Sequence, residues 1–255
     1  LQQLLSALEN SQQMVLEHSQ SKPWFWQREA KAAEATRAME LECKSIQAYS
    51  LALLLEHGAQ VNQAMEDGAT PLIVAAQAGH ATIVRALVKE FGADVDKAIL
   101  STGVTALMLG AKYGQKKVVK MLVEEGVDVD RASADTGATS LIDAAEEGHT
   151  DVVRVLLEKG KADVDKARTD NGATPLVLAS QNGHLEVVRD LLQYNADASK
   201  VLRSNGVTPL FAAAQEGHAE VVRVLLEDGK ADVNKAMAST GATPLFGAAQ
   251  AGHLE

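Results

Sequence analysis

The sequence predicts an all-α solenoid, in which short helix pairs stack along one axis. Closely similar segments begin at Gly68, Gly103, Gly137, Gly172, Gly206 and Gly241, so the interval between starts alternates between 35 and 34 residues. Repetition at this period is typical of solenoids, whose repeats pack only on their neighbours. Aromatic residues make up only 4% of the chain, against a hydrophobic content of 46%, which favours helices packed through Ala and Leu.

Each copy begins its first helix with a threonine, followed in most copies by a proline. A threonine hydroxyl can accept a hydrogen bond from an unpaired first-turn N–H, and proline suits the first helical position, where no N–H is needed. The predicted caps are Thr70, Thr105, Thr139, Thr174, Thr208 and Thr243. A glycine ends this helix, because a left-handed residue is favoured there. These glycines are Gly79, Gly114, Gly148, Gly183, Gly217 and Gly252.

The second helix of each copy follows directly and carries an apolar stripe. In the copy from Gly172, the stripe consists of Val187, Val188, Leu191 and Leu192. The repeats closely resemble the ankyrin repeat family, whose pattern is Gly-x-Thr-Pro-Leu-x-x-Ala-Ala-x-x-Gly-His, then an apolar helix and Gly-Ala-Asp-Val-Asn. The resemblance covers residues 68–255 and implies an ankyrin solenoid with projecting β-hairpin-like fingers between the helix pairs.

One position departs from the family pattern. The family usually has histidine after Thr-Pro-Leu, whereas this chain has apolar residues there. They are Ile73, Met108, Ile142, Val177, Phe211 and Phe246. We therefore expect apolar contacts between neighbouring first helices to replace the polar bonding of that histidine.

The chain divides into three predicted parts. Residues 1–28 form an amphipathic helix and a turn containing Trp24 and Trp26, residues 29–67 form a degenerate capping repeat, and residues 68–255 hold the regular repeats, the last of them incomplete. Terminal repeats are expected to be atypical because one of their faces has no neighbour. The two tryptophans either seal the first helix against the solenoid or form an interface hot spot.

Composition restricts the function classes. A net charge of −10 argues against general nucleic-acid binding, which depends on clusters of Lys and Arg. The lone cysteine, Cys43, allows neither an intramolecular disulfide nor a cysteine zinc cluster and suits a reducing intracellular compartment, the cytoplasm first. No apolar run approaches the roughly 20 residues that span a bilayer, so we expect no direct membrane insertion by this segment.

No catalytic or metal-binding pattern emerges from the repeats. Five histidines occupy one repeat position, and Gln115 replaces histidine in the copy from Gly103. Helix pairs stack about 8–10 Å apart, whereas zinc holds nitrogen at about 2.0–2.1 Å, so we expect these side chains to bond nearby backbone. The pairs Glu124-Glu125 and Glu146-Glu147 are predicted to be solvated, because adjacent helical residues point in different directions. We expect no cofactor, no metal and no enzymatic activity.

The resemblance implies a protein partner, bound through the concave groove and the finger tips. The groove contacts would come from the two residues ahead of each Gly-His. The candidates there are Lys112, Tyr113, Glu146, Glu147, Gln181, Asn182, Gln215 and Glu216. The candidates in the fingers are Ile99, Leu100, Arg168, Val201 and Leu202, whose apolar members either mark a contact site or tuck against a neighbouring finger. Tyr113, the only aromatic residue among the variable pairs, is the expected anchor.

Two other roles remain open from the sequence. One is a structural accessory subunit of a larger assembly, docked through the N-terminal helix and the segment Trp24 to Trp26. The other is the recruiting or regulatory arm of an enzyme or channel outside this segment. The chain starts at Leu1 without Met and stops early in a repeat at Glu255, so we expect it to be a piece of a longer protein, and an organelle stays possible.

Overall fold

A computed structural model describes residues 49–252. The chain divides into two compact units, residues 1–54 and 55–255, and the helix pairs belong to the second unit. Residues 49–56 are helical. The helices that follow are α3 (Pro71–Gln77), α4 (Ala81–Lys89), α5 (Ala106–Lys112), α6 (Lys116–Glu124), α7 (Ser140–Glu146), α8 (Thr150–Glu158), α9 (Pro175–Gln181), α10 (Leu185–Gln193), α11 (Pro209–Gln215), α12 (Ala219–Glu227) and α13 (Pro244–Ala251).

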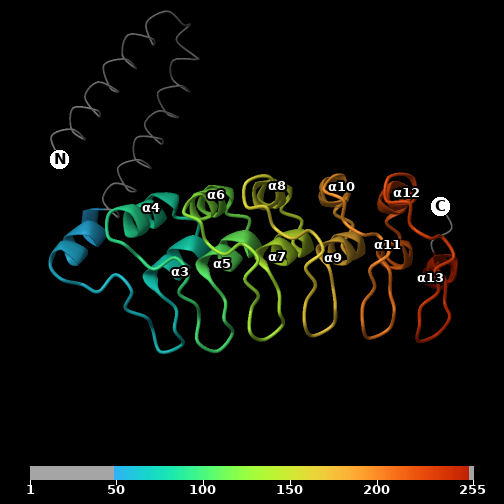
Figure 1. Cartoon of the computed structure of the whole chain (residues 1–255), viewed down its shortest axis with the longest axis horizontal. Helices are drawn as coiled ribbons and strands as arrows, with labels where there is room; N and C mark the ends of the chain where they lie inside the picture. Colours follow the sequence, from blue (N-terminus) through green and yellow to red (C-terminus); the bar gives the residue numbers. More distant parts are fainter. Residues whose placement is uncertain (1–48, 253–255) are drawn as a thin grey trace, which may run out of the picture. The chain divides into compact units, whose positions relative to one another are not determined.

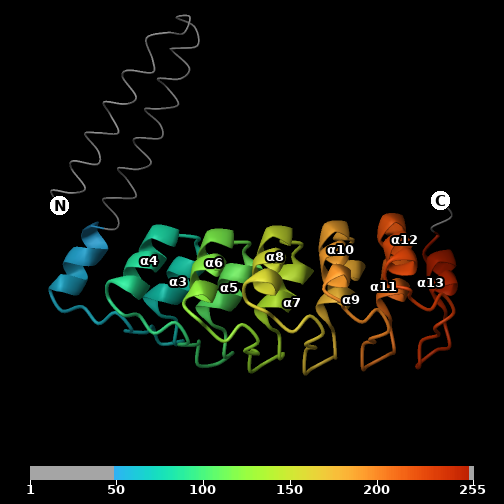
Figure 2. The same ribbon diagram turned by 45° about the horizontal axis from the view of Figure 1, so that its top comes forward.

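The helix pairs of the second unit form two rows (Figures 1 and 2). The first helices α3, α5, α7, α9, α11 and α13 pack side by side in one row, and the second helices α4, α6, α8, α10 and α12 form the other. Each first helix from α3 to α11 also packs against the second helix of its own pair. The predicted all-α solenoid of stacked helix pairs is therefore confirmed.

The predicted N-caps are in place on every first helix from α3 to α13. Each cap threonine has an extended backbone, and its hydroxyl accepts a hydrogen bond from the N–H three residues later. In α9, for example, Thr174 Oγ1 accepts from Val177 N at 3.4 Å. Proline occupies the first turn of α3, α9, α11 and α13, as the sequence predicts.

We expect Thr174→Ala to lower the free energy of unfolding by about 0.5–2 kcal/mol, the usual cost of losing a helix cap. Thr174 is only 1% exposed, so water does not replace the lost oxygen freely. Urea denaturation followed by circular dichroism measures this change. Thr82→Ala, the same deletion at an exposed position, is the control and should have a smaller effect. Equal midpoints for Thr174→Ala and the unmodified protein would contradict the assigned start of α9.

Apolar residues fill the position where the family usually has histidine. Ile73, Met108, Ile142, Val177 and Phe211 are all between 0% and 5% exposed, which agrees with the expected apolar contacts between neighbouring first helices. Phe246 departs from this pattern and is 57% exposed. It lies in α13, the last described helix, which packs on α11 at one side.

The loops between helix pairs project from the first helices (Figure 1). One hydrogen bond closes the neck of each loop, as when Arg168 N donates to Ala173 O at 2.9 Å. Within the described residues the only β-type pairing is an isolated antiparallel bridge between Ala98 and Thr105, so these fingers are closed turns without a regular strand ladder. Backbone bonds also join successive fingers, for example Thr169 N to Thr136 O at 3.0 Å.

Candidate functional site

The variable pairs ahead of each Gly-His lie at the carboxyl ends of the first helices. Tyr113 is the C-cap of α5, and Glu147 is the C-cap of α7. The following glycines, Gly114 and Gly148, have φ of 68° and 75°, a conformation that L side chains rarely adopt. The chain therefore turns at the same point of each repeat, which brings the variable pairs to one edge of the stack. We call Lys112, Tyr113, Glu146 and Glu147 the central row.

The repeated histidines hold this edge together. The ring Nε2 of His149 donates to the carbonyl oxygen of Lys112, that of His184 to Glu146, and that of His218 to Gln181, at 2.9, 2.9 and 3.0 Å. Gln115 Nε2 makes the equivalent bond to the carbonyl oxygen of Gln77 at 3.3 Å.

These bonds confirm the predicted role for His149, His184 and His218, and they add one detail. His253 lies outside the described residues. The acceptor always belongs to the preceding repeat, so each bond joins two repeats instead of closing a local loop. The bonds use only the backbone of the first residue in each pair. The side chains at these positions can therefore vary while the frame stays constant.

Side chains of the central row differ in exposure. Tyr113 is 49% exposed, Lys112 and Glu147 are exposed, and Glu146 is half-buried. A half-exposed tyrosine on a fixed helix end offers contact area with little conformational entropy to lose. The central row thus presents an aromatic and a basic side chain in one repeat and two acidic side chains in the next.

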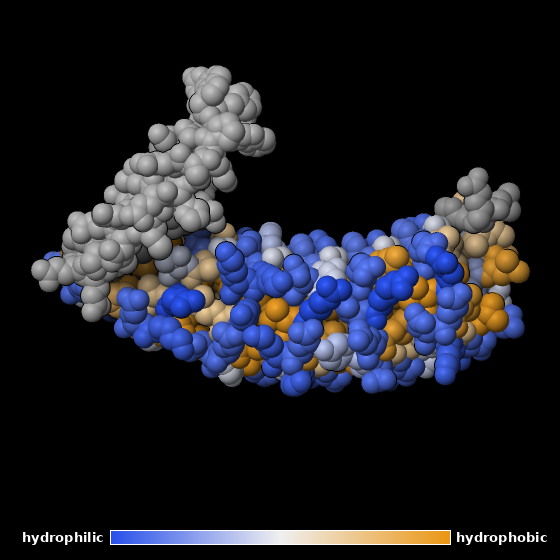
Figure 3. All heavy atoms as spheres, turned by 90° about the horizontal axis from the view of Figure 1, so that it is seen from above, coloured by the Kyte–Doolittle hydropathy of each residue, from blue (hydrophilic) through white to orange (hydrophobic). Residues whose placement is uncertain are grey.

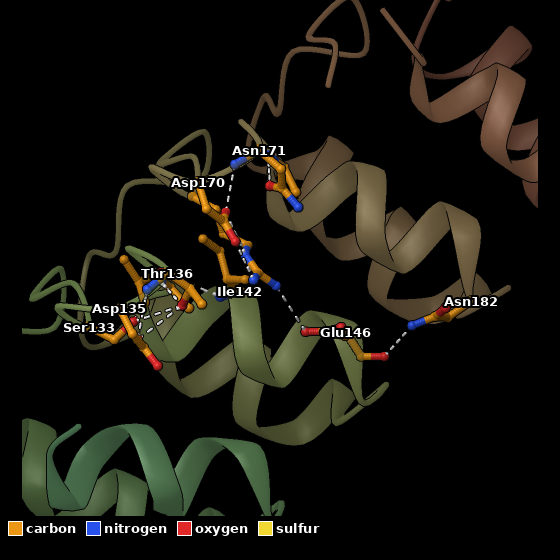
Figure 4. A network of polar contacts seen from close by, with 12 residues as sticks. Ser133, Asp135, Thr136, Ile142, Glu146, Asp170, Asn171 and Asn182 are labelled. Atoms are coloured by element: carbon orange, nitrogen blue, oxygen red, sulfur yellow. Dashed lines mark hydrogen bonds and ion pairs between the residues drawn. The ribbon is translucent and has the colours of Figure 1, made fainter. Parts of the chain in front are cut away.

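Glu146 is tied to both neighbouring elements (Figure 4). Its carbonyl oxygen accepts a hydrogen bond from Asn182 Nδ2 at 2.7 Å, and its carboxylate lies 4.0 Å from Arg168 Nη1. Arg168 in turn makes two hydrogen bonds to Asp170, at 2.8 and 3.1 Å, and its side chain is only 18% exposed. The hydrogen bonds to Asp170 raise the pKa of Arg168 above its ordinary value, and the charges of Asp170 and Glu146 act in the same direction, whereas burial opposes the rise.

Asp143, which sequence reasoning missed, lies in α7 one turn before Glu147. The pKa of Asp143 is raised to about 7, mainly by burial and also by the charges of Glu146 and Glu147, whereas Lys112 and Arg168 oppose the rise. Other first helices have apolar or small residues at this position, so comparison of the repeats could have identified it. The equivalent residues are Val74, Leu109, Leu178, Ala212 and Gly247.

The candidate residues of the fingers separate into exposed and packed side chains. Leu100 is 81% exposed, whereas Ile99, Val201 and Leu202 are half-buried. Leu202 packs against the core clusters around Ile142 and Phe211, which favours the tucked interpretation for this residue.

The remaining candidates lie outside the central row. Gln181, Asn182, Gln215 and Glu216 are exposed at the carboxyl ends of α9 and α11. Trp24 and Trp26 lie outside the described residues.

Metal-ligand clusters and membrane-spanning helices are both absent from residues 49–252. In this range there is no group of three or more His, Cys, Asp or Glu residues arranged to hold a metal ion. In the same range no helix combines the length and the apolar character needed to cross a membrane.

A row of helix pairs with a constant frame and variable side chains along one edge defines a helical repeat scaffold. A family model for ankyrin repeats in three copies matches residues 43–133, 126–201 and 196–255. The chain therefore belongs to the ankyrin repeat family. Ankyrin repeats generally mediate protein–protein interaction and are typically non-catalytic. No curated protein matches this chain significantly.

Proposed function

We propose that this protein is an interaction scaffold and that its partner protein binds across the central row, with Tyr113 as the anchor. The observation that carries the proposal is the 49% exposure of Tyr113 at a helix end that a His149 bond holds in place. Tyrosines in such positions are enriched among the residues that dominate binding energy. The exposed Leu100, in the finger before α5, offers a further apolar side chain to a partner.

The charges of the central row support a partner with complementary charges. Lys112 stands one repeat from Glu146 and Glu147, so a partner would meet a basic step followed by an acidic one. Electrostatic matching of this kind mainly sets specificity and association rate. The partner surface would accordingly carry an acidic group opposite Lys112 and basic groups opposite the two glutamates.

We expect Tyr113→Ala to weaken partner binding by at least about 1 kcal/mol, the usual boundary between energetic and neutral contacts. Affinity capture with mass spectrometry identifies the partner, and surface plasmon resonance then measures its binding. Tyr194→Ala is the matched control, because Tyr194 is 37% exposed at the end of the second helix α10. The control should bind normally, and both variants should keep the melting temperature.

Glu147→Lys should lower the association rate, and added salt should reduce the difference. Glu147 is the better position for charge reversal, because a lysine at 146 would approach Arg168. Full binding by both Tyr113→Ala and Glu147→Lys would contradict the proposal. The search for the binding surface would then move to the segment Trp24 to Trp26.

A further inference from the structure

The row of second helices carries a cation at the same position of each helix. These residues are Arg85, Lys120, Arg154, Arg189 and Arg223. In α8, α10 and α12 each of them has an acidic partner. Arg154 pairs with Asp190 at 2.8 Å, Arg189 with Glu186 at 3.8 Å, and Arg223 with Glu220.

The pattern changes at α4 and α6. Three residues before the cation, α10 and α12 have Glu186 and Glu220, whereas α4 has Thr82 and α6 has Lys117. The acidic residue is thus missing from α4, and a lysine replaces it in α6. Within the described part of the chain, neither Arg85, Lys117 nor Lys120 belongs to an ion pair, and all three are exposed.

These three cations line one groove of about 350 Å³ between α4 and α6, together with Thr82, Met121 and Glu124 among others. Glu124 is the only carboxylate of the lining, and Lys159 already bonds it at 3.1 Å. That bond is the main cause that lowers the pKa of Glu124, and the charges of Lys120 and Arg85 act in the same direction. The groove therefore holds an excess of positive charge on a chain whose net charge is −10.

We propose that the groove formed by Arg85, Lys117 and Lys120 binds an acidic segment of a partner protein. Carboxylates of this segment would take the place that Glu186 and Glu220 occupy beside their arginines in α10 and α12. The groove lies on the row of second helices, and Figure 3 shows this face of the repeat stack. Its lining residues are all different from those of the central row, so the two proposals rest on different observations.

The surroundings favour a short acidic segment over a long polyanion. Two acidic residues lie nearby, and each is paired with a lysine. Asp151 of α8 pairs with Lys116, and Glu125 at the end of α6 pairs with Lys89. Beyond these pairs the chain is acidic overall and would repel a nucleic acid that extends past the groove. A segment with two or three carboxylates meets the unpaired cations without this repulsion. Its binding should depend strongly on salt, because exposed ion pairs are screened.

Lys117→Glu tests the proposal while retaining the fold. It places a glutamate three residues before Lys120, in the geometry of the Glu186–Arg189 pair, so the new carboxylate satisfies Lys120 within the helix. The probe is a fluorescein-labelled oligoglutamate peptide, and fluorescence anisotropy at low salt measures its binding. We expect the affinity of Lys117→Glu to fall by at least about fivefold, since two charges change at the groove. Thermal melting checks that the variant is folded.

Lys235→Glu is the matched control, because it changes the net charge equally at an exposed loop position. It should retain the affinity of the unmodified protein. Arg85→Gln is a second groove variant and should also weaken binding. An unmodified protein that does not bind the peptide, or an equal loss in Lys235→Glu, would overturn the proposal. So would tighter, Lys117-dependent binding of single-stranded DNA or of phosphatidylserine vesicles, which would assign the groove to another class of ligand.

Discussion

Gly183→Ala is expected to lower the free energy of unfolding by about 2–3 kcal/mol, combining backbone strain with the loss of one hydrogen bond between repeats. Gly183 has φ of 74°, where an L residue is strained. A Cβ atom there would also lie 2.6 Å from Cε1 of His218. The ring cannot move aside without breaking its bond to the carbonyl oxygen of Gln181. The substitution therefore disturbs the joint between two repeats.

Gly126→Ala separates the two contributions. Gly126 has φ of 79°, close to that of Gly183, but no heavy atom lies within 4 Å of the added Cβ. We expect it to cost only the strain, about 1–2 kcal/mol. Urea denaturation of both variants measures the difference. In a His218→Ala background the additional cost of Gly183→Ala should vanish. Equal destabilisation by Gly126→Ala and Gly183→Ala in the unmodified background would show that the His218 hydrogen bond does not contribute to the free energy of unfolding.

Asp143→Asn is expected to stabilise the protein at alkaline pH and to leave it unchanged near pH 4. Burial raises the pKa of Asp143 from 3.8 to about 7 in the folded state. Between these values the folded protein binds more protons than the unfolded chain, so stability falls as pH rises and the loss is complete above about pH 7. Asparagine resembles the protonated side chain and avoids this loss.

The gain should reach about 1–2 kcal/mol at pH 8, because each pKa unit corresponds to about 1.4 kcal/mol and the half-buried site remains in part screened by solvent. Urea denaturation at pH 4 and at pH 8 measures it. Asp151→Asn provides the opposite sign, since the hydrogen bond from Lys116 lowers the pKa of Asp151. The native, ionised Asp151 stabilises the fold above pH 3.8, and this contribution is lost as pH falls. No gain for Asp143→Asn at pH 8 would contradict the raised pKa of Asp143.

Local patterns predicted the helices because short-range chemistry governs their ends. Thr174 caps the start of α9, and Gly183 supplies the left-handed residue after its end, and neither role depends on the neighbouring repeats. The period of the repeats then predicted the stacking, since identical faces recur along the chain. The sequence also showed that apolar residues such as Ile142 replace the family histidine, and the structure shows that Ile142 is buried.

Partners from neighbouring repeats were beyond local reasoning. The sequence showed that His184 recurs, but only the fold reveals that its acceptor is the carbonyl oxygen of Glu146, in the repeat before. Leu100 and Leu202 have equivalent chemistry in their fingers, yet one is 81% exposed and the other packs on two core clusters. The two leucines occupy different positions of the finger: Leu202 N donates to Val207 O as Ile99 N donates to Val104 O, whereas Leu100 lies one residue later, at the position of Arg203.

The sequence by itself determined the family, the helix boundaries and the edge on which the variable pairs stand. The tertiary structure decided the charge environment of that edge and of the row of second helices. Asp143 has a raised pKa because the stack buries it beside Glu146, and Lys120 lacks the acid that Arg154 finds in Asp190 of the next repeat. Electrostatic energies depend on distances between groups of different repeats, and those distances exist only once the repeats have stacked.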